Sequence, residues 1–345
     1  MSSTTSPGSR LLLVLAFIAI YFIWGTTYLA NRFGLDGMKP FVLSTLRYSA
    51  AGILLLLWCR IKKQSLPSWK DIKTLSISGI LLFVGGAGIV VFGEQYINSG
   101  HTAVVIATEP LLFLLMDRKN RSSYLSNPRT LTGIGLGFAG IFVFSYCTAP
   151  HAQAAGHPED IVKGTLLVLL STFFWVAGAL YAKNHHPKGV SAMAGVAVQY
   201  IAAALVCGII AIALGEWSSF NPRTVSTGAW AGLAFLVLMG SLVAFTAFNW
   251  LIRIKPPAVV STHTYVNPIV AVLLGGIMAG EVLNGIQVLA LFMVLTGVLL
   301  TNIKFNGSFT NTFTKRLNPF TKKSNPFAKS PTPFDKKLNL VQCEK

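Results

Sequence analysis

Two side chains of opposite charge fall inside apolar stretches of this sequence. Glu109 lies within residues 102–116 and Arg47 within residues 41–58. At about 1.5 Å of rise per helical residue, each is roughly 10 Å from the nearer end of its stretch. A charge at the centre of a membrane helix costs about 2.5–3.5 kcal/mol on insertion scales, and therefore indicates a functional group or a fixed ion pair. We expect Arg47 to be the partner of Glu109.

Two roles are open for each of these residues. Glu109 is either a carboxyl that exchanges a proton when its burial changes, or a permanently ionised carboxylate paired with Arg47 or bonded to backbone amides near Pro110. Arg47 is either the other half of that pair or a group that binds a substrate carboxylate through two parallel hydrogen bonds.

A second polar group precedes a proline in the second half of the chain. His263, Tyr265 and Asn267 lead to Pro268, and Asn249 closes the preceding apolar stretch. One such residue would be an ordinary interhelical hydrogen bond, but several together favour the wall of a binding cavity. For His263, a proton relay and a structural bond to a backbone carbonyl are both open.

Prolines and aromatic residues inside the apolar stretches point to the same cavity. Pro110 and Pro268 each remove a hydrogen bond within a helix, so we expect a kink at both positions. Trp24, Tyr28 and Trp175 lie within their stretches rather than at the ends where lipid-anchoring aromatic residues gather. We expect these three residues to line the cavity.

The composition predicts which elements position these side chains. The 345 residues are 53% hydrophobic and 11% charged, with a mean hydropathy of +0.61, which is typical of a membrane protein. Continuous apolar runs without alternation predict α-helices. We expect ten spans: Leu11–Ala30, Phe41–Trp58, Leu75–Phe92, Thr102–Met116, Leu131–Cys147, Gly164–Ala182, Ala192–Leu214, Gly228–Ile252, Ala258–Ala279 and Gly285–Ile303.

The two halves of the chain resemble each other. Arg47-Tyr48 recurs as Gln199-Tyr200 at nearly the same offset, so Gln199 is the counterpart of Arg47, and residues 103–110 match 261–268 when the prolines are superposed. An odd number of spans per repeat places the second copy upside down relative to the first. The predicted fold is an all-α integral membrane protein of ten transmembrane helices in two inverted five-helix repeats.

The basic residues predict the orientation in the membrane. With the N-terminus in the cytoplasm, thirteen Lys and Arg side chains fall in inside loops and four in outside loops. This asymmetry follows the positive-inside rule and places both termini of a multi-pass protein in the cytoplasm, within the inner or plasma membrane. The predicted segments are a first repeat (13–147), an external linker (148–162), a second repeat (163–303) and a basic, disordered tail (304–345). The tail either lies on the anionic inner leaflet or docks a partner.

Several kinds of function are unsupported by motifs. The sequence contains no GxxxxGK[ST], HExxH or GxSxG pattern, and the four cysteines show no metal-ligand spacing. We therefore expect no enzyme activity, no metal site, no cofactor and no nucleic-acid partner.

The joint spacing of several residues resembles the EamA family of the drug/metabolite transporter superfamily. The residues that carry this resemblance are Trp24, Arg47, Glu109-Pro110, and Pro268 followed by Gly280-Glu281. The resemblance implies a ten-helix bundle that alternates access and exports small metabolites, either amino-acid-like or amphipathic, with proton coupling as an open possibility. A facilitative channel or exchanger is the alternative, and an intramembrane enzyme is a more distant one.

Overall fold

The computed structural model describes residues 7–116, 126–148, 158–185, 187, 189–255, 260–279 and 284–302. The predicted tail (304–345), most of the predicted linker and the pair Gly280-Glu281 lie outside these residues. Every regular element of the described part is helical. An all-α fold is therefore confirmed.

The first half of the chain forms five helical passages, three of them built from successive segments. They are α1 (Pro7–Ile18), η1 (Ala19–Ile23) and α2 (Trp24–Gly34); α3 (Pro40–Ile61); α4 (Trp69–Gly79), η2 (Ile80–Gly88) and α5 (Ile89–Gly93); α6 (Ser99–Ile106) and α7 (Glu109–Met116); and α9 (Pro128–Thr148).

The second half repeats this order. Its elements are α10 (Pro158–Asn184); α11 (Ala192–Ala213); α12 (Thr227–Phe235), η5 (Leu236–Ala244) and α13 (Phe245–Ile254); α15 (His263–Ala279); and α16 (Gly285–Asn302), with a short 3-10 turn, η4 (Glu216–Ser219), before α12. By length and composition, seven helices of the described part can cross a membrane, and three shorter apolar helices lie within α9, α15 and α16.

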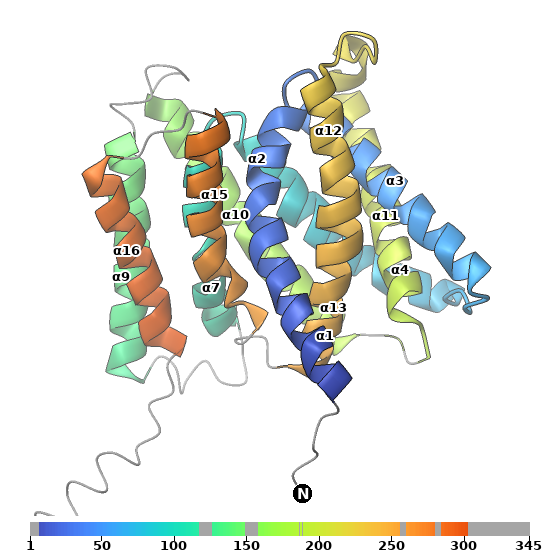
Figure 1. The fold of residues 1–345 in the computed structure, drawn as a ribbon, viewed down its shortest axis with the longest axis horizontal. Helices are drawn as coiled ribbons and strands as arrows, with labels where there is room; N and C mark the ends of the chain where they lie inside the picture. Colours follow the sequence, from blue (N-terminus) through green and yellow to red (C-terminus); the bar gives the residue numbers. More distant parts are fainter. Residues whose placement is uncertain are drawn as a thin grey trace, which may run out of the picture. The chain divides into compact units, whose positions relative to one another are not determined.

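The packing of the helices crosses from one half of the chain to the other in matched combinations. α3 packs on α11 and α9 packs on α16, each between elements of equal rank in the two halves, at opposite edges of Figure 1. The first passage of each half packs on the third passage of the other half, as α2 does on α12 and α10 does on η2. It also packs on the fourth passage of the other half, as α2 does on α15 and α10 does on α6 and α7. Both halves also place a nine-residue π-helical segment, η2 or η5, in the third helical passage.

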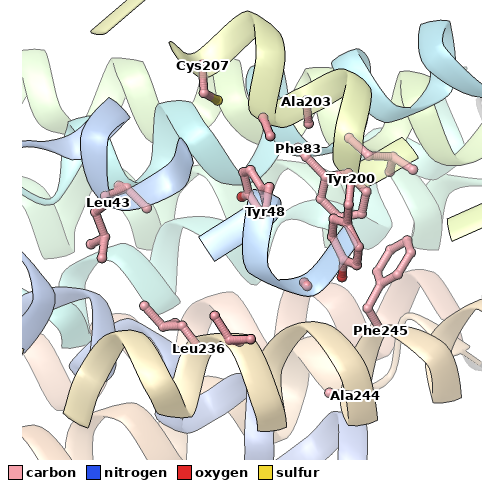
Figure 2. Close-up of a cluster of buried hydrophobic side chains, with 14 of the residues drawn as sticks. Leu43, Tyr48, Phe83, Tyr200, Ala203, Cys207, Leu236, Ala244 and Phe245 are labelled. Carbon is pink, nitrogen blue, oxygen red and sulfur yellow. The ribbon is translucent and has the colours of Figure 1, made fainter. Parts of the chain in front are cut away.

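An aromatic core joins the two halves. Tyr48 of α3 and Tyr200 of α11, the tyrosines of the repeated dipeptide, stack with ring centroids 5.7 Å apart and planes inclined by 9°. Phe83 of η2 contacts both rings, and Phe245 of α13 packs on Phe83 and Tyr200. Figure 2 shows these four side chains converging from four elements.

One of the two prolines, Pro110, occupies a different position from that expected. The fourth passage is broken at Ala107 and Thr108, and Pro110 lies in the first turn of α7, where a missing amide hydrogen breaks no helical bond. A kink inside a continuous helix at Pro110 is therefore wrong, because the helix ends before the proline is reached. Pro268 does lie inside a helix, α15, as expected.

Candidate functional site

A buried cavity lies where α2, α3, η2, α10 and η5 meet. It has a volume of about 90 Å³, and we call it the Arg47 cavity. Six of the residues singled out from the sequence line it: Trp24, Tyr28, Arg47, Glu109, Trp175 and His263. Long-range packing thus collects groups from both halves of the chain around one space.

The break in the fourth passage places Glu109 at this cavity. Glu109 is the first residue of α7 and is almost completely buried. A carboxylate in the first turn of a helix is stabilised by the positive end of the helix dipole. The sequence therefore creates a helix N-terminus inside the protein and puts an acid on it.

Glu109 and Arg47 have different partners in the structure. Glu109 Oε2 lies 4.0 Å from Nε2 of His263, and Arg47 Nε donates to Oγ of Ser241 at 3.0 Å. Within the described residues, the carboxyl of Glu109 forms its one ion contact with His263. The expected Arg47–Glu109 pair is therefore wrong, although both side chains line the same cavity. Ser241 of η5, 194 residues further along the chain, holds the guanidinium elsewhere.

His263 is oriented by its own backbone. Its Nδ1 lies 2.9 Å from the carbonyl oxygen of Val260, which accepts but cannot donate, so Nδ1 carries the hydrogen. In the neutral ring, Nε2 is then an acceptor that faces the Glu109 carboxyl. A hydrogen bond between these two groups would require a proton on one of them and a contact shorter than the observed 4.0 Å.

Three polar atoms at the wall of the Arg47 cavity are buried without a well-formed hydrogen bond in the described part of the chain. They are Asn31 Oδ1, Glu109 Oε1 and Trp175 Nε1. The Trp175 indole interacts with the Glu109 carboxyl, but the two atoms do not reach good hydrogen-bond geometry. Buried polar groups in folded proteins are normally paired, so unpaired acceptors and a donor at one cavity are typical of a binding site.

The π-helical segment η5 supplies the opposite wall. Gly240 O accepts from Trp24 Nε1 at 3.3 Å, and Ser241 O accepts from the Tyr200 hydroxyl at 3.0 Å. A Cβ on Gly240 would lie only 3.0 Å from Thr27 and 3.3 Å from Arg47, so glycine permits this close approach. The i→i+5 pattern of a π-helix is frequent at functional sites because it redirects backbone carbonyls.

A second cavity, of about 320 Å³, adjoins the same group of aromatic rings. Gln199 and Asn249 line this space, which we call the Gln199 cavity. Phe245 lines both cavities, while Trp24 and Trp175 face the first and Phe248 the second. The four rings contact one another at centroid distances of 5.0–6.3 Å, and we call them the aromatic barrier.

Asn267, Pro110 and Pro268, which were also singled out from the sequence, line neither cavity, and the side chain of Tyr265 lies outside the described part of the chain. Asn267 is buried and structural, because its amide donates to the carbonyls of Tyr21 at 2.8 Å and His263 at 3.0 Å. Pro110 and Pro268 are buried within their helices, and Tyr265 lies on α15. The sequence reasoning missed Asn31, Ser78 and Ser241. Asn31, an amide directly after the apolar stretch 11–30, carries a signal that could have been noticed, whereas serines such as Ser78 and Ser241 are common inside apolar helices.

Comparison with known proteins places the chain in a family. The model of the EamA-like transporter family matches residues 11–146 and again residues 162–303. The chain is similar to an uncharacterised inner membrane transporter, YedA, of Escherichia coli K12, with 34% identity over 289 residues that cover 84% of this chain and 90% of the relative. It is also similar to an uncharacterised transporter, YoaV, of Bacillus subtilis 168, with 22% identity and coverage of 85% and 97%.

The fold also matches a solved structure. A crystal structure superposes with a TM-score of 0.59 at 17% identity and covers 89% of this chain and 98% of its own chain. Together with the apolar helices, the family matches support a multi-pass membrane protein with a general role in transport. The chain therefore belongs to the EamA-like transporter family.

Proposed function

We propose that this protein is a secondary transporter that exports small amino-acid-like or amphipathic metabolites and binds them in the Arg47 cavity. The observation that carries the proposal is the convergence, on one buried space, of a guanidinium, a carboxyl at an internal helix end and unpaired polar atoms. Such a space suits a molecule with both an anionic and a cationic or donor group, because each end meets its complement.

We further propose that the ten helical passages form two inverted five-helix repeats. Exchanging the halves of the chain converts each major helix contact into another that is also present, and the Tyr48–Tyr200 stack would then lie near the axis that relates them. The Arg47 cavity and the Gln199 cavity, which both adjoin the aromatic barrier, would be counterparts that open in turn.

Alternating access agrees better with these features than an open channel does. The rings of the aromatic barrier line both cavities, and the Arg47 cavity is smaller than the roughly 300–1,000 Å³ of typical ligand sites. Transport would therefore require a conformational change that enlarges one cavity and then the other. The Glu109–His263 contact supplies the group that would take up and release a proton in that cycle.

Flux in proteoliposomes tests this function. A panel of radiolabelled amino acids and amphipathic amines should include a substrate whose uptake is driven by an imposed pH gradient. Glu109→Gln should abolish gradient-driven uptake while retaining substrate binding, because the amide cannot titrate. Glu159→Gln is the matched control, since Glu159 is an exposed carboxylate in the first turn of α10.

Two outcomes would count against the proposal. Gradient-driven uptake of wild-type size by Glu109→Gln would remove Glu109 as the proton carrier. Uptake that never saturates and shows no exchange of substrate across the membrane would favour a facilitative channel.

A further inference from the structure

The Gln199 cavity contains a buried hydrogen-bond acceptor without a partner. Gln199 is 5% exposed, and its Nε2 donates to Ser78 Oγ at 2.8 Å. Ser78 Oγ itself donates to the carbonyl of Leu75 at 2.8 Å, so it can only accept from Gln199. These bonds fix the amide orientation and leave Gln199 Oε1 without a hydrogen bond in the described part of the chain. A ligand N–H or O–H would satisfy this atom.

The charge around this cavity has one sign. Lys183, His185 and Arg253 line it and are exposed, and none of the described residues that line it is acidic. A concave surface with like charges and apolar walls concentrates ions of the opposite sign. The ligand that fits this surface therefore carries a negative charge.

The remaining wall is apolar and large enough for a ring. Leu82, Phe245 and Phe248 face the space, and its volume of about 320 Å³ falls within the range of small-molecule sites. Phe245 and Phe248 also belong to the aromatic barrier, so a ligand seated here would touch the layer that closes the route to the Arg47 cavity.

We propose that the Gln199 cavity is a second binding site, for small organic carboxylates that combine an apolar body with an N–H or O–H donor. The carboxylate faces Lys183 and Arg253, the donor bonds to Gln199 Oε1, and the apolar body packs on Phe245 and Phe248. This site deepens the proposed transport function, because it is where an anionic substrate would be held before the aromatic barrier opens.

Calorimetric binding to the full chain in nanodiscs tests the site with three matched probes. N-acetyl-L-phenylalanine has a carboxylate, an N–H and a ring; its primary amide lacks the charge, and 3-phenylpropionate lacks the N–H. We expect the first to bind, and the other two to bind about tenfold more weakly, which is the factor for one hydrogen bond or charge contact. Raising the salt concentration should weaken the two anions and leave the amide unchanged.

Variants identify the cavity in which the probe binds. Gln199→Leu should weaken the binding of N-acetylphenylalanine about tenfold and leave that of 3-phenylpropionate unchanged, because only the first probe has an N–H that bonds to Gln199 Oε1. Ser78 keeps its hydrogen bond to the Leu75 carbonyl in this variant. The double variant Lys183→Gln/Arg253→Gln should weaken both anions about tenfold. Lys70→Gln is the matched charge control, since this exposed lysine at the start of α4 does not line the cavity. Should Gln199→Leu fail to fold, Ala182→Phe blocks the same space without removing a polar group.

Equal affinities for N-acetylphenylalanine and its amide, or unchanged binding in the Gln199→Leu and Lys183→Gln/Arg253→Gln variants, would overturn the site. Binding lost in Arg47→Gln but kept in the Gln199 variants would assign the probe to the Arg47 cavity instead. Failure here is distinct from failure of the transport proposal, because binding is measured without flux. A bound probe with no flux in proteoliposomes would contradict transport alone.

Discussion

At the scale of single residues, three buried charged side chains contact groups that are far away in the sequence. Arg47 is held by Ser241, Glu109 faces His263, and Glu216 accepts hydrogen bonds from the amides of Phe41 and Val42. In each of these contacts the two residues are more than 100 positions apart in the sequence, so each contact joins the two halves of the chain.

The observed contacts predict how the effects of paired substitutions on stability combine in double-mutant cycles. Glu109→Gln and His263→Gln should be non-additive, with a coupling of about 0.5–3 kcal/mol, because the side chains are in contact. Glu109→Gln and Arg47→Gln should show the smaller coupling of the two cycles, because they do not share a partner. Thermal unfolding of single and double variants in one detergent measures both. A larger coupling for the Arg47 cycle would restore the ion pair expected from the sequence.

Glu216 gives a second prediction, about α3. Its Oε2 accepts from Phe41 N at 2.8 Å and Val42 N at 3.0 Å and so caps the start of that helix. Glu216→Ala should cost about 1–3 kcal/mol, because two amides lose their acceptor. Glu216→Gln keeps an amide oxygen there and should lie closer to the wild type. Equal losses in the two variants would show that the charge, rather than the acceptor, stabilises the helix.

The same residue has a predicted pH dependence. Burial, which outweighs the hydrogen bonds from Val42 and Phe41, raises the pKa of the Glu216 carboxyl above its usual value of 4.5. Because the folded state then binds the proton more tightly, this contribution to stability is present below pH 4.5 and is lost as pH rises through the folded-state pKa. This contribution should raise the unfolding temperature of the wild type at pH 4 relative to pH 7. Glu216→Gln should remove that part of the difference between the two pH values. An unchanged slope would contradict the assignment.

At the scale of elements, irregular helices form the site. The broken fourth passage creates the helix end that carries Glu109, and η5 offers Gly240 O, Ser241 O and Ser241 Oγ to three different side chains. By contrast, α3 and α11 each run unbroken for 22 residues. α3 contributes Arg47 to one cavity, and α11 contributes Gln199 to the other. Regular helices therefore set the position of the site, and irregular ones supply its hydrogen bonds.

The close packing of α9 on α16 is tested by a glycine pair. A Cβ on Gly297 would lie 2.5 Å from the backbone oxygen of Gly133 and 2.6 Å from the nitrogen of Gly137, so Gly297→Ala must push the helices apart. We expect a loss of about 1–3 kcal/mol in thermal unfolding. Gly135→Ala is the control, because its Cβ would meet nothing within 4 Å, and it should be neutral or stabilising by up to about 1 kcal/mol. Equal behaviour of the two variants would contradict direct contact between these backbones.

At the scale of the whole molecule, the charge pattern predicts a topology. In a variant without native cysteines, single cysteines placed within residues 183–190 and in the tail should react with impermeant reagents only from the cytoplasmic side. Both positions follow from the excess of Lys and Arg in those loops. Labelling of the tail from outside would mean an odd number of spans, which is incompatible with two inverted five-helix repeats.

Deletion of residues 310–345 is expected to leave transport intact. Every described residue that lines either cavity lies between Trp24 and His263, and the second family match ends at residue 303, before the deleted segment begins. Flux in proteoliposomes, normalised to monodisperse protein, measures the effect. A deletion variant that folds but does not transport would assign the tail a part in the cycle.

The sequence by itself determined the helical class, the approximate extent of the apolar helices and six of the residues at the Arg47 cavity. These follow from local physics, because a run of about 20 apolar residues must satisfy its own backbone in a membrane, and a polar residue within it is costly unless it is used. The predicted stretch 192–214 and the observed α11, Ala192–Ala213, differ by one residue for this reason.

Only the tertiary structure decided which polar groups meet. Arg47 bonds to Ser241 and Glu109 faces His263, across 194 and 154 residues, and no spacing in the sequence encodes such distances. The packing of α10 and η5 also assigned Gln199 and Asn249 to a separate cavity from Arg47. Helix formation is set by neighbouring residues, whereas the pairing of buried groups is set by how whole helices fit together, which depends on every side chain at the interface.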